Sequence, residues 1–351
     1  MMNHYFIKKV VAIILIMLIS VSIAGCGNSD QKYTRTDFMM DTVVQVTAYG
    51  RNAKKAVDES MNKLKEIDNL MSTQKSGSDV QKINDNAGVK YVKVNPETFY
   101  VIKTALKYSK ISDGYFDITI APLVNLWGIG TNHAHVPTES QIKDAMRYIN
   151  YKDVLLDEKN DEVKLSRKGM AIDLGGIAKG FAADELENIM KENGIKHALI
   201  NLGGSSVYLY GSKPDGSNWN IGIQDPFGDK GTYFAIVSGK DMLIDTSGNY
   251  ERYFIQNGKR YHHILNPFTG YPAESGVVST TIVSTNIKSI DADALSTIAF
   301  ILGVDKGMKL VESMPGVDAI FVTPDYKVYA TSGLKGKLKI TDSRFKLYEN
   351  R

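Results

Sequence analysis

The sequence has 351 residues, of which 43% are hydrophobic and 23% are charged, and these values are typical of a globular protein with a substantial core. Its 42 basic and 39 acidic residues leave a formal net charge of only +3, so we expect no nucleic-acid partner. The single cysteine, Cys26, excludes an internal disulfide, a thiolate zinc site and an iron–sulfur cluster built from this chain.

The N-terminal segment has the pattern of a secretory signal. Two lysines precede an almost wholly apolar stretch, residues 10–23, which is shorter than the roughly 20 residues that a membrane-spanning helix needs. The stretch leads into Ile-Ala-Gly-Cys, which resembles a bacterial lipobox, whose cysteine thiol takes a diacylglycerol. We therefore expect a signal peptide at residues 1–25, lipidation of Cys26, a polar tether at residues 26–36 and a cell-membrane location on the extracytoplasmic face. The alternative is an ordinary signal peptide followed by an incidental cysteine.

The first half of the remaining chain is richer in helices. The hydrophobic pattern predicts a strand, a long helix, a polar loop with one short turn, a second helix, an irregular loop, a short helix with Thr138 as its N-cap, and a hairpin. In that order, these elements are expected at residues 43–49, 53–70, 72–88, 96–112, 128–138, 140–149 and 154–165.

The second half is richer in strands. A helix closed by Gly194 is followed by eight strands, two helices and a final strand pair. The first helix is expected at residues 176–193, and the eight strands at 198–202, 207–210, 219–223, 233–237, 242–244, 250–256, 260–265 and 278–283. The two later helices are expected at 291–303 and 306–314, and the final strand pair at 319–323 and 328–331. Because the helices occur in blocks rather than after every strand, the order favours an α+β fold with largely antiparallel sheets and inserted helices, and an arrangement in two lobes stays open.

Residues 173–180 (DLGGIAKG) place an acid, two glycines and a lysine at the expected start of a helix. Backbone N–H groups are unpaired there and the helix dipole is positive, so the segment suits an anion, to which Lys179 would add a positive charge. It has neither the GxxxxGK[ST] pattern nor the spacing of GxGxxG. A tight strand-to-helix turn capped by Asp173 is the alternative.

Residues 291–297 (DADALST) open an apolar helix and bring hard oxygen atoms together. Asp293 and Thr297 are four residues apart, so their side chains share one face of the helix. A carboxylate, a hydroxyl and main-chain carbonyls form an oxygen set that suits Mg²⁺. Simple capping of the helix N-terminus by acidic residues is the alternative.

Residues 261–270 (YHHILNPFTG) carry a histidine pair. In a strand, His262 and His263 face opposite sides, which argues against a metal site that uses both rings. One of them can act as a general base because its unperturbed pKa lies near 6.5. A hydrogen-bonded structural histidine is the alternative.

Residues 112–117 (SDGYFD) form a turn after a helix and contain an aromatic pair. Tyr115 and Phe116 could stack on a planar ring, or they could simply pack against the core.

These segments resemble the motifs of a known family, both in their residues and in their order along the chain. The chain resembles the ApbE family of FAD:protein FMN transferases over nearly the whole mature sequence. The motifs that carry the resemblance lie at residues 40–42, 71–73, 112–117, 122–128, 173–180, 201–204, 246–248, 263–267 and 293–297.

The resemblance implies a flavin transferase domain at residues 37–351. The family moves FMN from FAD to a Thr or Ser hydroxyl of an acceptor protein, typically a subunit of a membrane redox pump, and releases AMP with the help of Mg²⁺. It implies His263 as the base. It further implies FAD contacts at Met40, Tyr115, Phe116, Asp117, Asp173, Lys179 and Ile264, and Mg²⁺ ligands at Gly176, Asp293, Ser296 and Thr297.

Two positions depart from the family pattern. Gln74 follows Met-Ser-Thr where many relatives carry an aromatic residue, and Asn266 stands where relatives often have aspartate before proline. Loss of a ring at position 74 could let water compete with the acceptor hydroxyl, which would make the protein an FAD pyrophosphatase that yields FMN and AMP. That hydrolase, and a lipid-anchored flavin-binding protein without chemistry, are the alternatives to the transferase.

Overall fold

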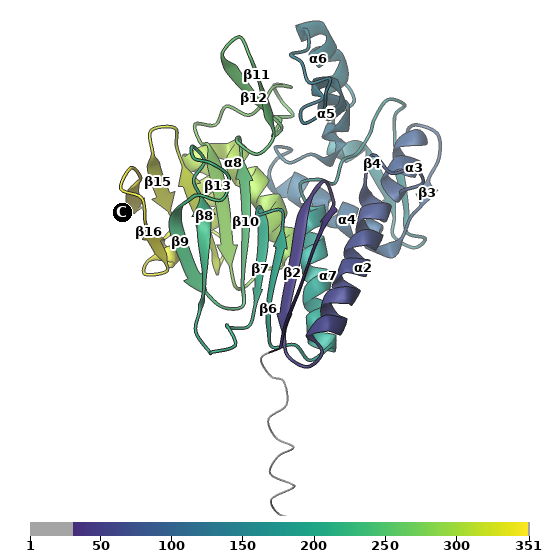
Figure 1. Ribbon diagram of the computed structural model, residues 1–351. Helices are drawn as coiled ribbons and strands as arrows, with labels where there is room; N and C mark the ends of the chain where they lie inside the picture. Colours follow the sequence, from purple (N-terminus) through teal and green to yellow (C-terminus); the bar gives the residue numbers. More distant parts are fainter. Residues whose placement is uncertain (1–30, 350–351) are drawn as a thin grey trace, which may run out of the picture.

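The computed structural model describes residues 31–349, so the expected signal peptide and Cys26 lie outside the described residues (Figure 1). The described chain is built on a nine-stranded sheet in the order β1-β2-β6-β7-β10-β13-β14-β15-β17, in which all neighbours are antiparallel except β15 and β17. Its strands are β1 Lys32–Met39, β2 Thr42–Tyr49, β6 His197–Leu202, β7 Ser206–Tyr210, β10 Met242–Gly248, β13 Ser279–Ser284, β14 Val317–Val322, β15 Lys327–Ala330 and β17 Lys346–Glu349. The expected α+β fold with largely antiparallel sheets is confirmed.

The large sheet is covered differently on its two faces. Because successive side chains of a strand point to opposite faces, Leu243 of β10 packs with the helices and Ile244 packs with a second sheet. The helices on the first face are α2 (Ala53–Met71), α7 (Ala178–Glu192) and α8 (Ser289–Glu312). The second sheet has the order β16-β9-β8, with β8 at Trp219–Gln224, β9 at Tyr233–Gly239 and β16 at Leu338–Ile340.

The remaining elements flank these layers (Figure 1). They are α3 (Asp79–Asp85), β3 (Val92–Lys93), α4 (Pro96–Ile111), η1 (Ile118–Ile120), α5 (Ala121–Trp127), α6 (Glu139–Met146), η2 (Tyr151–Asp153), β4 (Val154–Asp157), β5 (Glu162–Leu165), β11 (Tyr253–Gln256), β12 (Lys259–His262) and η3 (Ser332–Leu334). One hydrophobic core includes Val44 of the large sheet and Val163 of the small sheet β3-β5-β4, so an arrangement in two lobes would not divide the core.

Local signals in the sequence explain several element ends. Thr138 caps α6 through a capping box with Gln141, and Gly194 follows α7 with φ = 65°, the left-handed conformation expected there. The two helices expected after residue 290 form α8, which is interrupted at Gly303, where φ is 74° and a Cβ atom would lie 2.5 Å from the carbonyl oxygen of Ser275. None of the helices within residues 31–349 is both long and apolar enough to cross a membrane.

Several expectations about element boundaries were wrong, including the following three. β1 begins at Lys32, inside the segment expected to be a tether, because it is an edge strand that pairs with β2 alone and shows no clear polar–apolar alternation. β16 and β17 follow the strand pair that was expected to end the fold. The strand expected to reach residue 265 ends at His262, because the backbone N–H of the next residue closes the hairpin on Arg252.

Candidate active site

The segment 173–180 forms a tight turn that leads into α7. Asp173 Oδ1 accepts a hydrogen bond from the Gly175 N–H at 2.6 Å, and no side-chain hydrogen bond within the described chain caps the helix at Ile177. A Cβ atom on Gly180 would lie 2.2 Å from the carbonyl oxygen of Ser289. The glycine therefore lets the first turn of α7 touch the start of α8.

The positive end of α7 binds a carboxylate of the protein itself. Asp293 of α8 is 5% exposed, and its Oδ2 accepts a hydrogen bond from the Gly180 N–H at 2.9 Å. Its Oδ1 lies 3.3 Å from Lys179 Nζ. The anion-binding character expected of this helix end and the acidic motif at residues 291–297 thus meet at one point.

The hydroxyl groups of α8 lie beside this carboxylate. Ser247 of β10 places its Oγ 2.9 Å from Ser296 Oγ and 3.2 Å from Thr297 Oγ1. Ser296 Oγ in turn donates to the carbonyl oxygen of Asp293 at 2.9 Å. A Cβ atom built on Gly176 would be 3.7 Å from Thr297 Oγ1, so this glycine also borders the cluster.

The oxygen set fits a magnesium ion. Gly176, Asp293, Ser296 and Thr297 come together from α8 and the turn before α7, and they offer a carboxylate, hydroxyls and main-chain oxygens. Residues 31–349 contain no cluster of three or more His, Cys, Asp or Glu residues arranged to hold a metal. A cation here would therefore depend on hard oxygen ligands, to which substrate phosphates commonly add.

His263 lies just after β12 and is oriented by Arg252. The carbonyl oxygen of Arg252 is 3.1 Å from the His263 backbone nitrogen and 3.2 Å from Nδ1. Since a carbonyl only accepts, Nδ1 carries the proton, and in the neutral ring the lone pair lies on Nε2. Removal of water around the ring, followed by the charge of Arg252, lowers the pKa of His263 to about 3. The ring is therefore neutral at physiological pH, and Nε2 keeps its lone pair.

His262 has the structural role. It is 6% exposed, its Nε2 donates to the carbonyl oxygen of Ala273 at 3.1 Å, and its Nδ1 accepts from the Ile264 N–H at 3.3 Å. Its ring meets that of Phe300 edge to face at 5.5 Å. Burial lowers its pKa to about 4. The two histidines therefore have separate partners.

Arg252 joins the histidine to the turn between β1 and β2, although no sequence motif marks it as a site residue. Its Nη2 donates to the carbonyl oxygen of Asp41 at 2.9 Å, and Met40 and Asp41 have φ values of 53° and 57°. Burial raises the pKa of Asp173, and the nearby charges of Arg252 and Lys179 oppose that rise. The expected contacts Met40, Asp173 and Lys179 thus share one charged neighbourhood with His263.

The aromatic motif at residues 112–117 is divided between two environments. Phe116 is buried, and its Cε2 would lie 3.1 Å from a Cβ atom on Gly176. The ring of Tyr115 packs edge to face with that of Phe268 at 4.9 Å, and Phe268 is 56% exposed. The exposed ring of Phe268 is available to pack against a planar ligand.

Asp117 holds a turn in place through hydrogen bonds, and Ile264 is buried. The carboxylate of Asp117 accepts hydrogen bonds from the Thr119 N–H, the Thr119 hydroxyl and the Tyr151 N–H at 2.8, 2.6 and 2.9 Å. It therefore ties the turn after residue 116 to η2, and its direct contact with FAD stays a prediction. Ile264 is 6% exposed and follows the two histidines.

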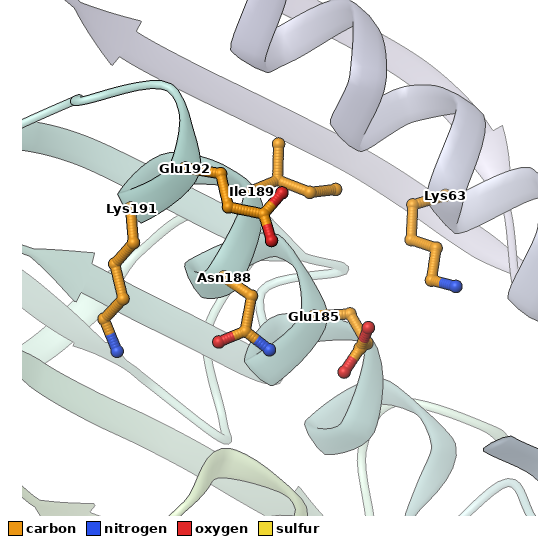
Figure 2. Close-up of a pocket in the computed structure, with 6 residues that line it drawn as sticks. All are labelled: Lys63, Glu185, Asn188, Ile189, Lys191 and Glu192. Atoms are coloured by element: carbon orange, nitrogen blue, oxygen red, sulfur yellow. The ribbon is translucent and has the colours of Figure 1, made fainter.

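A separate pocket lies between α2 and α7, away from these motifs. Figure 2 shows Lys63 on α2 facing residues of α7. The pocket has a volume of about 420 Å³, and it is lined by Lys63, Glu185, Asn188, Ile189, Lys191 and Glu192. None of the expected site residues contributes to it, so we place the candidate site at the α7–α8 contact instead.

Comparisons with known proteins agree with the motifs. Residues 40–321 match the ApbE family. The chain belongs to the ApbE family. It is 33% identical to the FAD:protein FMN transferase of Treponema pallidum (strain Nichols), with 95% of this chain and 96% of the relative covered. It is 36% identical to the FAD:protein FMN transferase of Klebsiella pneumoniae (strain 342), with coverages of 82% and 88%.

Solved structures of ApbE proteins share the fold. The crystal structure of the ApbE protein from Thermotoga maritima has a TM-score of 0.80 and 35% identity, with 88% of this chain and 99% of that chain covered. The flavin transferase ApbE from Vibrio cholerae has a TM-score of 0.77 and 26% identity, with the same coverages. The ApbE architecture therefore accounts for 88% of this chain.

Proposed function

We propose that this chain transfers FMN from FAD to the hydroxyl of a Thr or Ser residue in an acceptor protein, depends on Mg²⁺, and releases AMP. The observation that carries the proposal is the contact between α7 and α8. There Asp293 is bound by Lys179 and Gly180 beside Thr297 and Gly176. The names of the similar proteins supply the substrate and the product.

In the reaction, the acceptor oxygen attacks the phosphorus of the FMN half of FAD. A new P–O bond forms, the bond from that phosphorus to the bridging oxygen breaks, and AMP leaves with the electron pair. The proton of the acceptor hydroxyl passes to Nε2 of His263, whose Nδ1 is oriented by the Arg252 carbonyl. No covalent intermediate with the enzyme is required.

The chain's other residues hold the substrate and its charge. Lys179 places a positive charge beside the carboxylate of Asp293, where the pyrophosphate would bind. A bound Mg²⁺ would supply Lewis-acid stabilisation of the phosphate oxygens through Asp293, Thr297, Ser296 and Gly176. Tyr115 and Phe268 form the rim on which the flavin ring would pack.

The remaining parts of the proposal concern location and partner. The lipobox-like sequence before Cys26 would anchor the enzyme to the outer face of the cell membrane. An acceptor in a membrane redox pump with an extracytoplasmic flavin would then lie in the same compartment.

One incubation tests the proposal and separates its alternatives. The protein is mixed with FAD, Mg²⁺ and the extracytoplasmic domain of a redox-pump subunit, and the products are read by mass spectrometry. A covalent FMN adduct on the acceptor, with AMP released, supports the transferase. Free FMN and AMP without an adduct indicate the pyrophosphatase, and unchanged FAD indicates a binding protein.

A further inference from the structure

A buried acid of β10 lacks well-formed hydrogen bonds. Asp245 is 1% exposed, and within the described residues neither of its carboxylate oxygens has a partner with good hydrogen-bond geometry, although the Ser206 hydroxyl lies near enough to interact with it. Within the same residues, the hydroxyl oxygens of Ser206 and Thr280 are also buried and lack a partner with such geometry. An unsatisfied buried polar group is costly, and it calls for a ligand that the protein atoms do not provide.

The register of the strands places the side chains of Asp245, Ser206 and Thr280 close together. Asp245 of β10 is directly opposite Ser206 of β7, and Ser247 is directly opposite Thr280 of β13. Opposed residues of antiparallel strands share a face, and so do residues two apart on one strand. All of these side chains therefore point to the face that carries Leu243, which packs with the helices.

The direction of α8 sets Asp245 beside Asp293. β13 is antiparallel to β10, and α8 follows β13 after a short connection, so α8 runs parallel to β10. The step from Asp245 to Ser247 is about 7 Å along the strand, and the step from Asp293 to Thr297 is about 6 Å along the helix. Because Ser247 contacts Thr297, Asp245 faces Asp293 across the interface.

We propose that Asp245 is a second carboxylate of the cation site, so that the divalent cation of the proposed function is held between β10 and α8. Two facing carboxylates carry two negative charges, and Lys179 supplies one positive charge. A divalent cation would turn the local net charge from −1 to +1, which then favours a pyrophosphate. Mg²⁺ is commonly bound through one or two carboxylates plus substrate phosphates, so the pair fits this ion.

The test is a titration with Mn²⁺, followed by its electron paramagnetic resonance signal, on the complete mature protein without FAD. The variants are Asp245→Asn, Asp293→Asn and the control Asp225→Asn. Asp225 is a buried carboxylate that pairs with Arg344 in the second sheet region. We expect Asp245→Asn to weaken Mn²⁺ binding at least tenfold and Asp225→Asn to bind like the wild type.

The outcomes separate this inference from the proposed function on which it rests. If Asp293→Asn weakens Mn²⁺ binding and Asp245→Asn stays within twofold of the wild type, the second carboxylate is wrong and the magnesium site stands. If both variants bind Mn²⁺ like the wild type, the magnesium part of the proposed function also fails.

A second measurement does not depend on folding of the variants. Wild-type crystals are soaked in Mn²⁺, and anomalous diffraction locates the ion. A peak in direct or water-mediated contact with both Asp245 and Asp293 is expected. A peak on Asp293 with Asp245 turned away overturns the inference.

Discussion

His262 and His263 are neighbours in the chain, but their ring nitrogens are used differently. Both nitrogens of His262 are bound by the backbone, at Ala273 and Ile264. Among the described residues, the Arg252 carbonyl is the one hydrogen-bond partner of the His263 ring, at Nδ1, so Nε2 is left for the proposed substrate. The assignment of the base therefore depends on Ala273 and Arg252, which lie 11 residues from their histidines, and it cannot be read from the dipeptide.

We expect His263→Ala to bind FAD but to transfer FMN very slowly, because it lacks the proton acceptor. The loss should be about 10²–10⁴-fold, the usual contribution of a general base. FAD affinity is measured by fluorescence quenching and the rate by adduct formation. His262→Gln is the matched control, since it changes the adjacent ring and should stay active. An inactive His262→Gln with an active His263→Ala would reverse the assignment.

Asp245 is a residue of the proposed cation site that no sequence motif indicated. The motifs gave Asp293, Thr297 and the α7 turn, and the structure brings these residues together. Asp245 has no recognisable motif, although one signal was present. It follows Leu243 by two residues in an apolar strand, so its acid occupies a position that faces the core.

At the scale of elements, the site depends on how closely α7 approaches α8. Gly180 donates its N–H to Asp293, and it has no room for a side chain against Ser289. The long helices were predictable because their apolar residues recur at helical spacing. β1 was not, because an edge strand exposed along most of its length carries little periodic signal.

We expect Gly180→Ala to lower the free energy of unfolding by about 1–3 kcal/mol, the usual cost of overpacking, and to reduce activity. The added methyl group would press on backbone, which cannot rotate away as a side chain can. Urea unfolding and adduct formation measure the two effects. Ala183→Gly, at another buried position of α7, should cost about 1 kcal/mol of helix stability and keep its activity. Equal losses of activity in both variants would argue against a special role for this contact.

At the scale of the whole molecule, the site joins segments that lie far apart in sequence. The turn at residues 40–41, the start of α7, the region from β10 to β12 and the start of α8 all contribute. Their meeting depends on the order of strands in the large sheet, which the motifs alone could not give. The motifs therefore predicted residues that the fold brings close together, while their arrangement required the complete fold.

We expect acid to destabilise the folded chain partly through His262. Its pKa is about 4 when folded and about 6.5 when unfolded, so the two states bind protons equally above pH 6.5. Below pH 6.5 the unfolded chain takes up a proton that the folded chain excludes, and stability falls until about pH 4. At pH 5 this costs about 2 kcal/mol. Urea unfolding at pH 7.5 and pH 5 should show a smaller loss for His262→Gln, and an equal loss in both proteins would contradict the assignment.

The last prediction concerns the attachment of the molecule to the membrane. Cys26 is the only cysteine, and it follows a short apolar stretch that ends in small residues. We expect its thiol to be lipidated and the signal peptide to be removed in front of it. Acyl chains would then provide the anchor, because the net charge of the chain is too small to hold it to a membrane surface.

Cys26→Ala should accumulate as an unprocessed precursor without an acyl label. Metabolic labelling with a fatty acid and the apparent mass on a gel measure the two effects in cells. Ser29→Ala, in the polar segment after the cysteine, is the matched control and should be processed and labelled like the wild type. Processing and labelling of Cys26→Ala at the wild-type level would show that the anchor lies elsewhere. Because β1 begins at Lys32, five residues separate the cysteine from the first strand that the structure describes. The strand β1 then spans roughly 25 Å from Lys32 to the turn at residues 40–41, so the site would lie at the end of the fold that points away from the anchor, where it could reach an extracytoplasmic domain of the acceptor.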